Sequence, residues 1–255
     1  MKIGLSLSGG GARGIAHLGV LQALEELGIK PNKIAGVSAG AIAGAMYAAG
    51  YAPHEIFEMV KKIKITSFLK PSSFKSPGFF NLKVVENFLK KSIPHNSFEQ
   101  LKIPLMVTAT DLHLGETVLF REGNLIKPVI ASASIPVLFS PVNHHGKSLV
   151  DGGIINNLVV EPLISECDIS IAVHTNPFDK NLSINSTRLL LLRCLNLAIH
   201  SKDRANFPYF DLVIDIEKLK DISALKLSRA DEIFQIGYDS AMEMRDNILA
   251  LLEKI

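Results

Sequence analysis

The spacing of apolar residues along this chain switches repeatedly between a period of two, which is typical of strands, and a period of about 3.6, which is typical of helices. Alternating or continuously apolar runs predict strands at 2–8, 33–37, 105–110, 137–143, 147–150, 169–174 and 211–216. Helical spacing predicts helices at 14–28, 39–49, 54–64, 83–91, 125–134, 186–204 and 229–253. Strands that alternate with helices form parallel sheets, so the pattern predicts an α/β fold of three layers, with a mainly parallel central sheet covered by helices on both faces.

The chain shows no internal repeat and no linker that would divide it. Its 255 residues suffice for one large domain with a sizeable core, so a single domain over 1–255 is expected. The most apolar stretch, 189–199, contains Arg193 and falls short of the ~18 apolar residues that a membrane-spanning helix needs. We expect this stretch to be a helix that faces the core.

The cysteines and the N-terminal residues bear on where the protein works. Cys167 and Cys194 lie in apolar surroundings and form neither a disulfide framework nor a metal-binding spacing, which favours a reducing compartment. The first strand begins directly after Met1 and Lys2, so cleavage of a secretory signal peptide would remove the glycine-rich stretch at 8–14. The expectation is a cytoplasmic protein, with peripheral attachment to a membrane as the alternative.

Positive charge is concentrated between residues 61 and 91. This segment holds eight lysines and a single acid, Glu86, in a chain whose net charge is +2, and five phenylalanines interleave with the lysines. Basic charge with aromatic side chains suits peripheral contact with an anionic membrane. A solvated flap whose phenylalanines pack on the core explains the same composition. No nucleic-acid-binding motif accompanies the charge, so nucleic acid is not expected as a partner.

A serine stands between two glycines where the second predicted strand gives way to a helix. The sequence is Gly36-Val37-Ser38-Ala39-Gly40, a Gly-x-Ser-x-Gly arrangement that forms a nucleophile elbow at such a junction. Small flanking residues permit a sharp turn with the hydroxyl at its tip. There, the free N–H groups and the dipole of the following helix favour developing negative charge. The alternative is a helix N-cap serine between two turn glycines.

A glycine-rich stretch, Ser-Gly-Gly-Gly-Ala-Arg-Gly at 8–14, follows the first predicted strand. Consecutive glycines expose backbone N–H groups that can cradle an anion. Gly9, Gly11 and Gly14 also satisfy the dinucleotide fingerprint Gly-x-Gly-x-x-Gly. That fingerprint needs an acidic residue at the end of the second strand, and 33–37 ends without one. We therefore interpret the stretch as an oxyanion hole that faces the serine.

A third element, Asp151-Gly152-Gly153, follows the short apolar strand at 147–150. A strand that ends in aspartate and two glycines places a carboxylate at its tip, with room for close backbone approach. Taken alone, this element is most simply an ordinary turn aspartate. It follows the other two elements in the chain, and the order of all three is informative.

Together the three elements resemble the patatin-like phospholipase family. The order is a glycine-rich loop, then Gly-x-Ser-x-Gly, then a distant Asp-Gly-Gly. Between the last two, Ala-Ser-Ala-Ser-Ile-Pro at 131–136 is similar to the family's Ala-Ser-x-x-x-Pro block. The resemblance is to the short bacterial members and covers most of the chain. Plant patatins begin the glycine loop with aspartate where this chain has Ser8, a difference that leaves the backbone donors unchanged.

The resemblance implies a patatin-like form of the three-layer fold and a role for each motif residue. It makes Ser38 the nucleophile and Asp151 its base, in a serine–aspartate dyad. The oxyanion hole would be formed by the loop backbone with Arg13 beside it, through Gly9, Gly10 and Gly11. The remaining motif glycines would support the turns: Gly14, Gly36, Gly40, Gly152 and Gly153. No cofactor is expected, and the sequence contains no metal-binding spacing and no calcium loop of alternating acids.

Histidine is the usual partner of a catalytic serine, and the sequence offers eight. His144 and His145, in a polar turn, are the strongest histidine rivals of Asp151, followed by His174 at the end of a predicted strand. His17 lies among apolar residues near the glycine loop, where a packed or capping role is favoured over catalysis. The others are typical of solvated surface positions: His54, His95, His113 and His200.

The chemistry that these motifs specify is acyl transfer. An unperturbed aspartate has a pKa of ~3.9 and is a weak base, so the dyad requires burial of Asp151 and an effective oxyanion hole. The substrate class comes from the resemblance, which implies hydrolysis of lipid acyl esters: phospholipids, lysophospholipids or simple carboxyl esters. An acyltransferase with the same residues and a regulatory protein with little turnover are the alternatives. The acyl chain, the headgroup and the oligomeric state stay open.

Overall fold

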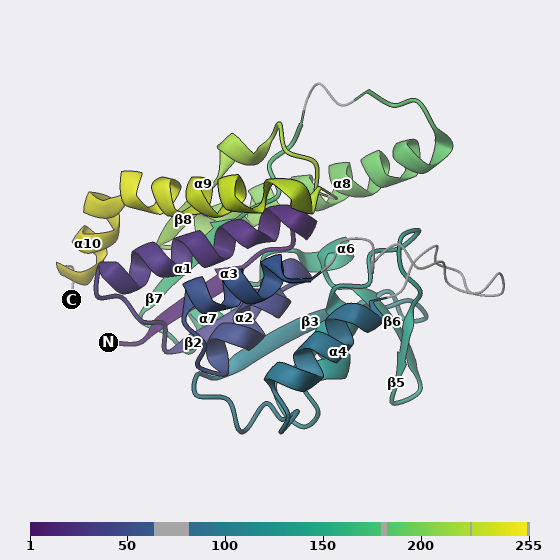
Figure 1. Cartoon of the computed structure of the whole chain (residues 1–255), viewed down its shortest axis with the longest axis horizontal. Coiled ribbons are helices and arrows are strands. Elements are labelled where there is room, and N and C mark those ends of the chain that lie inside the picture. The colour runs from purple at the N-terminus through teal and green to yellow at the C-terminus, as the bar shows by residue number, and fades with distance from the viewer. Residues whose placement is uncertain (64–81, 180–182, 225, 254–255) are drawn as a thin grey trace.

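The structure is a computed structural model that describes residues 1–63, 82–179, 183–224 and 226–253 (Figure 1). Most of the basic segment 61–91 lies outside the described residues, so its membrane contact stays a prediction. Within the described chain, eight strands form one sheet. In chain order they are β1 (Ile3–Leu7), β2 (Lys33–Gly36), β3 (Leu105–Asp111), β4 (Glu116–Phe120), β5 (Val142–His144), β6 (Lys147–Asp151), β7 (Ile169–His174) and β8 (Leu212–Asp215).

The helices of the described chain alternate with these strands. The α-helices are α1 (Ala16–Glu26), α2 (Ala39–Ala48), α3 (Pro53–Lys61), α4 (Lys83–Ser92), α5 (Ile126–Ser132), α6 (Gly153–Asn156), α7 (Glu161–Ile164), α8 (Thr187–Asn206), α9 (Ala230–Glu243) and α10 (Arg245–Glu253). Short 3₁₀ helices are η1 (Gly11–Ile15), η3 (Phe207–Tyr209), η4 (Glu217–Leu219) and η5 (Leu227–Arg229).

The sheet is mainly parallel, as predicted. Strands β3, β2, β1, β7 and β8 run parallel in that spatial order. Two additions are antiparallel: β4 pairs with β3 through a tight turn, and the β5–β6 hairpin joins through β6, which also pairs with β3. The carboxyl ends of the parallel strands therefore lie along one edge of the sheet, and the antiparallel strands approach the site from the opposite direction.

The two edges of β3 are used differently, and the difference positions the candidate site. Val107 pairs with β4 and with Gly36 of β2, whereas Ala109 pairs with β4 and with Asp151 of β6. Strands β2 and β6 therefore share one edge of β3, end to end. β2 leaves that edge after Gly36, and β6 takes its place while running the other way, so the last residue of β6 points at the end of β2.

Alternation along the strands gives the sheet two buried faces. Ile34 belongs to the larger apolar cluster, which the sheet shares with α1, α2, α3 and α9, and α1, α3 and α9 lie together over this face in Figure 1. Its neighbour Ala35 points the other way, into a smaller cluster with the segment 158–160, α7 and η3. Helices on both faces confirm the three-layer arrangement.

Several predicted elements differ in the structure. The predicted strand at 137–143 is wrong over 137–141, because Val137 adopts a positive φ of 70° in the turn after Pro136, and the strand begins only at Val142. The predicted helix 229–253 is broken at Met244, where the last turn of α9 tightens. The predicted helix 14–28 starts as the 3₁₀ helix η1 before α1 begins. The apolar pattern does not predict β4, because its residues are those of a largely exposed edge strand.

Helix α8 does not face the core along the apolar stretch 189–199, so that expectation is wrong. Leu190, Leu191 and Leu197 are 48%, 53% and 48% exposed. The buried residues of α8 come later, at Asp203 and Asn206. At 20 residues and ~1.5 Å per residue, α8 is longer than the strands beside it, so its N-terminal half extends past the carboxyl edge of the sheet (Figure 1). No helix of the described chain is long and apolar enough to cross a bilayer.

Candidate active site

Ser38 stands on a sharp turn between β2 and α2. Its backbone has φ 53° and ψ −119°, a conformation that a residue with a Cβ rarely adopts. The turn requires Gly40 two residues later, since a Cβ there would lie 2.2 Å from the Leu7 carbonyl oxygen. The buried hydroxyl of Ser132 accepts the Ser38 N–H at 2.8 Å and supports the turn. This is the strained strand–turn–helix geometry of a nucleophile elbow.

Asp151 is the hydrogen-bond partner of Ser38. The Ser38 hydroxyl donates to Asp151 Oδ2 at 2.6 Å, and Asp151 Oδ1 accepts the Gly153 N–H at 2.8 Å. The carboxylate is 6% exposed. Its burial raises the pKa of Asp151 to about 6, against the opposing effect of the two hydrogen bonds. Asp151 is therefore a stronger base than an exposed aspartate, and it is still ionised at neutral pH.

The sheet register explains why these residues meet although 113 positions separate them in the chain. Ser38 comes two residues after Gly36, which pairs with Val107, and Asp151 pairs with Ala109, two residues further along β3. Ser38, in the turn after β2, and Asp151, at the end of β6, therefore lie at the same position along β3. The sequence correctly placed Asp151 at a strand tip, but this strand, β6, is antiparallel to the five parallel strands of the sheet.

The glycine loop packs against the serine turn. A Cβ on Gly14 would lie 2.3 Å from the Ala39 Cβ, and one on Gly9 would lie 3.0 Å from the Ser38 Cβ. The N–H groups of the loop differ in whether they already have an acceptor. The Gly9 N–H donates to Asn157 Oδ1 at 2.8 Å. Those of Gly10 and Gly11 have no hydrogen-bond acceptor within the described chain. Gly11 has a φ of +58°, a left-handed conformation that favours glycine.

Arg13 is buried beside the loop, and its side chain binds other loops of the protein. Its Nε donates to the Ile222 carbonyl oxygen at 2.6 Å, and its terminal nitrogens donate to the carbonyl oxygens of Pro177 and Lys220 and to Asn176 Oδ1. The guanidinium thereby fastens the segments after β7 and β8 to the glycine loop. It shares no hydrogen bond with Ser38 or Asp151 in the described structure.

The histidines weighed against Asp151 are bonded elsewhere. His17 is buried, and its Nε2 lies 2.7 Å from the Ser8 carbonyl oxygen; burial lowers the pKa of His17 to about 4. His174 Nδ1 lies 2.8 Å from Asp215 Oδ1, and its Nε2 lies 3.2 Å from Asp203 Oδ2. Within the described chain, Ser38 forms no hydrogen bond with a histidine side chain. The rings of His144, the last residue of β5, and of His145 contact each other with centroids 4.1 Å apart.

Some of the residues that build this site were not singled out from the sequence. Ser132 supports the serine turn, and the backbone around it also holds the acid, since the Asp151 N–H donates to the Ser134 carbonyl oxygen at 3.0 Å. The family-like block at 131–136 was a signal that pointed to this region. Asn157 and Asp203 carried no sequence signal, because their contacts depend on how α6 and α8 pack.

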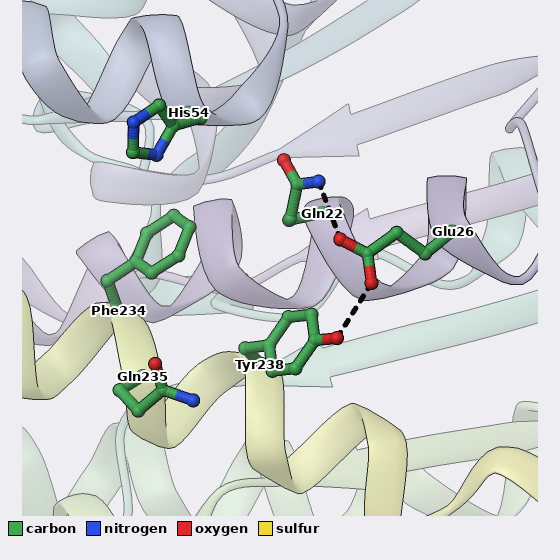
Figure 2. A pocket seen from close by; sticks show the side chains of 6 residues that line it. All are labelled: Gln22, Glu26, His54, Phe234, Gln235 and Tyr238. Atoms are coloured by element: carbon green, nitrogen blue, oxygen red, sulfur yellow. Dashed lines mark hydrogen bonds between the residues drawn. The ribbon is translucent and has the colours of Figure 1, made fainter.

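A surface hollow lies apart from these residues. This hollow of about 290 Å³ is formed by side chains of α1, α3 and α9, where Glu26 accepts hydrogen bonds from Gln22 and Tyr238 (Figure 2). It contains none of the motif residues. Within the described chain, no group of three or more histidine, cysteine or acidic side chains is arranged to hold a metal ion.

A serine on a strained turn at the end of a parallel strand, backed by a glycine-rich loop, places the chain in the class of α/β proteins with a nucleophile elbow. Within this class, the sequence identifies one family. Residues 5–164 match the family described as patatin-like phospholipase, and the chain belongs to this family. The family is one of lipid acyl hydrolases.

Similar proteins agree with this family. An uncharacterized NTE family protein of Mycobacterium tuberculosis is 35% identical over 178 residues, which are 69% of this chain and 49% of that protein. Lysophospholipase nte1 of Aspergillus fumigatus is 27% identical over 267 residues, covering 92% of this chain and 18% of that protein. The chain thus spans about half the length of the mycobacterial relative and a smaller share of the fungal one.

Two solved structures share the fold. VipD from Legionella pneumophila superposes with a TM-score of 0.62 at 15% identity, covering 96% of this chain and 66% of that chain. The type III effector protein ExoU gives a TM-score of 0.51 at 15% identity, over 96% of this chain and 53% of that one. At this identity the likeness concerns the fold alone.

Proposed function

We propose that this protein hydrolyses acyl esters of lipids, with Ser38 as nucleophile and Asp151 as its base. The observation that carries the proposal is the 2.6 Å hydrogen bond from the Ser38 hydroxyl to the buried Asp151 carboxylate. Membership of a lipid acyl hydrolase family and the name of the fungal relative, a lysophospholipase, support the substrate class. We therefore expect phospholipids, lysophospholipids or simple carboxyl esters as substrates.

In the first half of the proposed reaction, Ser38 Oγ attacks the ester carbonyl carbon while Asp151 Oδ2 takes the hydroxyl proton. The carbonyl oxygen becomes an oxyanion, which the N–H groups of Gly10 and Gly11 are free to receive. Collapse of this intermediate breaks the bond to the alcohol, which leaves with the proton from Asp151. The acyl group remains on Ser38 as an ester.

In the second half, a water molecule attacks the acyl–serine ester. Asp151 removes one proton from this water, and the same oxyanion donors stabilise the second tetrahedral intermediate. Collapse releases the carboxylic acid, and the proton returns from Asp151 to Ser38 Oγ. The raised pKa of Asp151 suits the role of base, because a carboxylate that titrates near pH 6 accepts a proton more readily than an exposed one.

We propose that residues 1–255 act as one domain in this reaction. The family match ends at residue 164, but β7 pairs with β1 and α9 packs along α1. Residues after the match also hold the glycine loop, since the N–H of Ala12 donates to the Ala224 carbonyl oxygen at 2.7 Å. The C-terminal part is thus needed to shape the site.

The test is covalent labelling by a fluorophosphonate probe, with the adduct mapped by mass spectrometry. We expect the wild-type protein to be labelled at Ser38 and to cleave p-nitrophenyl esters and lysophospholipid, and Ser38→Ala to do neither. Ser170→Ala is the matched control, because Ser170 is another buried serine of the sheet, and among the described residues its hydroxyl forms hydrogen bonds with Asp211 alone. Folded wild-type protein that resists labelling and cleaves no ester would contradict the proposal.

A further inference from the structure

Asn157 is a buried residue that follows α6 and joins separate parts of the site. Its Oδ1 accepts the Gly9 N–H at 2.8 Å, and its Nδ2 donates to Asp203 Oδ2 at 2.8 Å. The residue is 3% exposed. The two partners fix the orientation of the amide, since a backbone N–H can only donate and the Asp203 carboxylate accepts. The amide therefore connects the glycine loop to helix α8 in one defined orientation.

The carboxamide oxygen of Asn157 lies against the glycines next to Ser38 and Asp151. A Cβ on Gly9 would lie 2.4 Å from Asn157 Oδ1 and 3.0 Å from the Ser38 Cβ. A Cβ on Gly153 would lie 2.8 Å from the same Oδ1 and 3.0 Å from Asp151 Oδ1. Asn157 thus fills the space between the glycine loop and the turn that follows Asp151, directly behind the Ser38–Asp151 hydrogen bond.

Asp203 holds the other end of this amide. It lies in the C-terminal half of α8 and is itself 0% exposed, and its Oδ2 also lies 3.2 Å from His174 Nε2. A carboxylate acceptor makes the bond from Asn157 stronger than one between neutral groups. The position of the amide is therefore set by a rigid helix and a buried histidine.

Three consecutive glycines have wide backbone freedom, so a loop that must present two N–H groups in fixed directions needs anchors. We propose that Asn157 is a positioning residue of the oxyanion hole: its carboxamide, held by Asp203, fixes the Gly9 peptide so that Gly10 and Gly11 present their N–H groups to the oxyanion. This inference rests on the proposed function. It assigns Asn157 no contact with the substrate and no proton transfer.

The test compares Asn157→Ala with Asn156→Ala. Asn156 is the matched control, because its Oδ1 also accepts a hydrogen bond from α8, from Asn206 Nδ2 at 3.1 Å, whereas within the described chain its side chain forms no hydrogen bond with the glycine loop. We expect Asn157→Ala to lower kcat for a p-nitrophenyl ester and the rate of fluorophosphonate labelling by about 10- to 100-fold, with KM changed less than about threefold. Asn156→Ala should stay within about twofold of the wild type.

A second pair of variants keeps the test decisive even if Asn157→Ala fails to fold. Asn157→Asp keeps the acceptor for Gly9 but sets two carboxylates against each other, and we expect it to lose activity. Adding Asp203→Asn exchanges donor and acceptor and restores the bond. We therefore expect the kcat of the double variant to be at least about tenfold higher than that of Asn157→Asp. A structural role alone would alter the melting temperature without this recovery in kcat.

The outcomes separate the two proposals. If the wild type is labelled and Asn157→Ala reacts as fast as Asn156→Ala, or if the double variant recovers nothing over Asn157→Asp, the positioning role is overturned while the proposed function stands. If the folded wild type is neither labelled nor active on esters, the proposed function itself fails.

Discussion

Two groups of buried polar side chains lie near the same end of the sheet, and they differ in whether the buried charge has an oppositely charged partner. In the reactive pair, Ser38 and Asp151, one carboxylate is buried with a hydroxyl and a backbone N–H as its bonded partners among the described residues. In the histidine cluster, defined as His174, Asp203, Asp215 and Arg204, two carboxylates flank a fully buried imidazole and an arginine pairs with one of them.

The difference shows in the direction of each pKa. Burial raises the pKa of Asp151 to about 6, because no cation of the described chain compensates its charge. Burial by itself would lower the pKa of His174, but the hydrogen bonds and charges of Asp203 and Asp215 raise it to about 9. Burial by itself would raise the pKa of Asp215, but the hydrogen bond and charge of His174 and the charge of Arg204 lower it.

The comparison teaches that a buried charge becomes chemically useful when it is left uncompensated. The reactive pair is costly to fold but can exchange a proton near neutral pH. The histidine cluster keeps its protons in place over a wide pH range and serves to hold α8, β7 and β8 together. Replacing one member of each group tests whether reactivity and stability are divided in this way.

The largest effect is expected at Asp151. Asp151→Asn removes the base while keeping its shape, and we expect kcat to fall by about 10⁴-fold. The same change should stabilise the fold at pH 8 by about 2 to 3 kcal/mol, because the folded-state pKa of about 6 against 3.8 makes the ionised carboxylate destabilising above pH 6. Ester kinetics and urea unfolding measure the two quantities. A variant that is both active and less stable would break the comparison.

His174→Gln should give the opposite result. It removes the cation between Asp203 and Asp215, and we expect the free energy of unfolding at pH 7 to fall by about 3 to 5 kcal/mol. The kcat of protein that remains folded should stay within about tenfold of the wild type, since His174 does not contact Ser38. Urea unfolding with His54→Gln as an exposed control checks the stability. Loss of activity in a fully stable His174→Gln protein would instead make this histidine a positioning residue that acts through Asp203.

The pH dependence of Ser38 reactivity should follow Asp151 alone. Below pH 6 the carboxylate becomes protonated, so the fluorophosphonate labelling rate should fall about tenfold per pH unit and reach about 1% of its plateau at pH 4. Stopped labelling reactions between pH 4 and 8 measure this limb, with circular dichroism as the control for folding. A flat profile across this range would show that Asp151 is not the group that activates Ser38.

The smallest expected effect is the alkaline loss of stability. The pKa of His174 is raised from 6.5 to about 9 in the folded protein, so its contribution is complete below pH 6.5 and is lost as the pH rises through 9. We expect a loss on the order of 1 to 3 kcal/mol between pH 7 and 10 in the wild type. The loss should be absent from His174→Gln under the same conditions. Equal pH slopes in the two proteins would mean that His174 is neutral when buried.

The sequence predicted the parts of this site that are encoded locally. The glycine loop and the serine turn are short motifs at strand–helix junctions, where turn geometry and small residues determine the conformation. The antiparallel entry of Asp151 was not predictable, because it depends on β6 occupying the edge of β3 that β2 leaves free. The histidine cluster depends on α8 placing Asp203 and Arg204 beside the ends of β7 and β8, which no local pattern predicts. The exposed leucines of α8 show the same limit, since apolar composition alone did not tell which face would be covered.

The shared edge of β3 also has a consequence for how the protein acquires its reactivity during synthesis. Ser38 and Asp151 are 113 residues apart, so the growing chain carries its serine for a long interval before the aspartate exists. Contacts between distant segments form slowly, because closing a long loop costs conformational entropy before the contact is made. A released fragment that ends before β6 contains the elbow and the glycine loop but lacks Asp151. Under the proposed mechanism, acyl transfer would therefore begin only after β6 has joined β3.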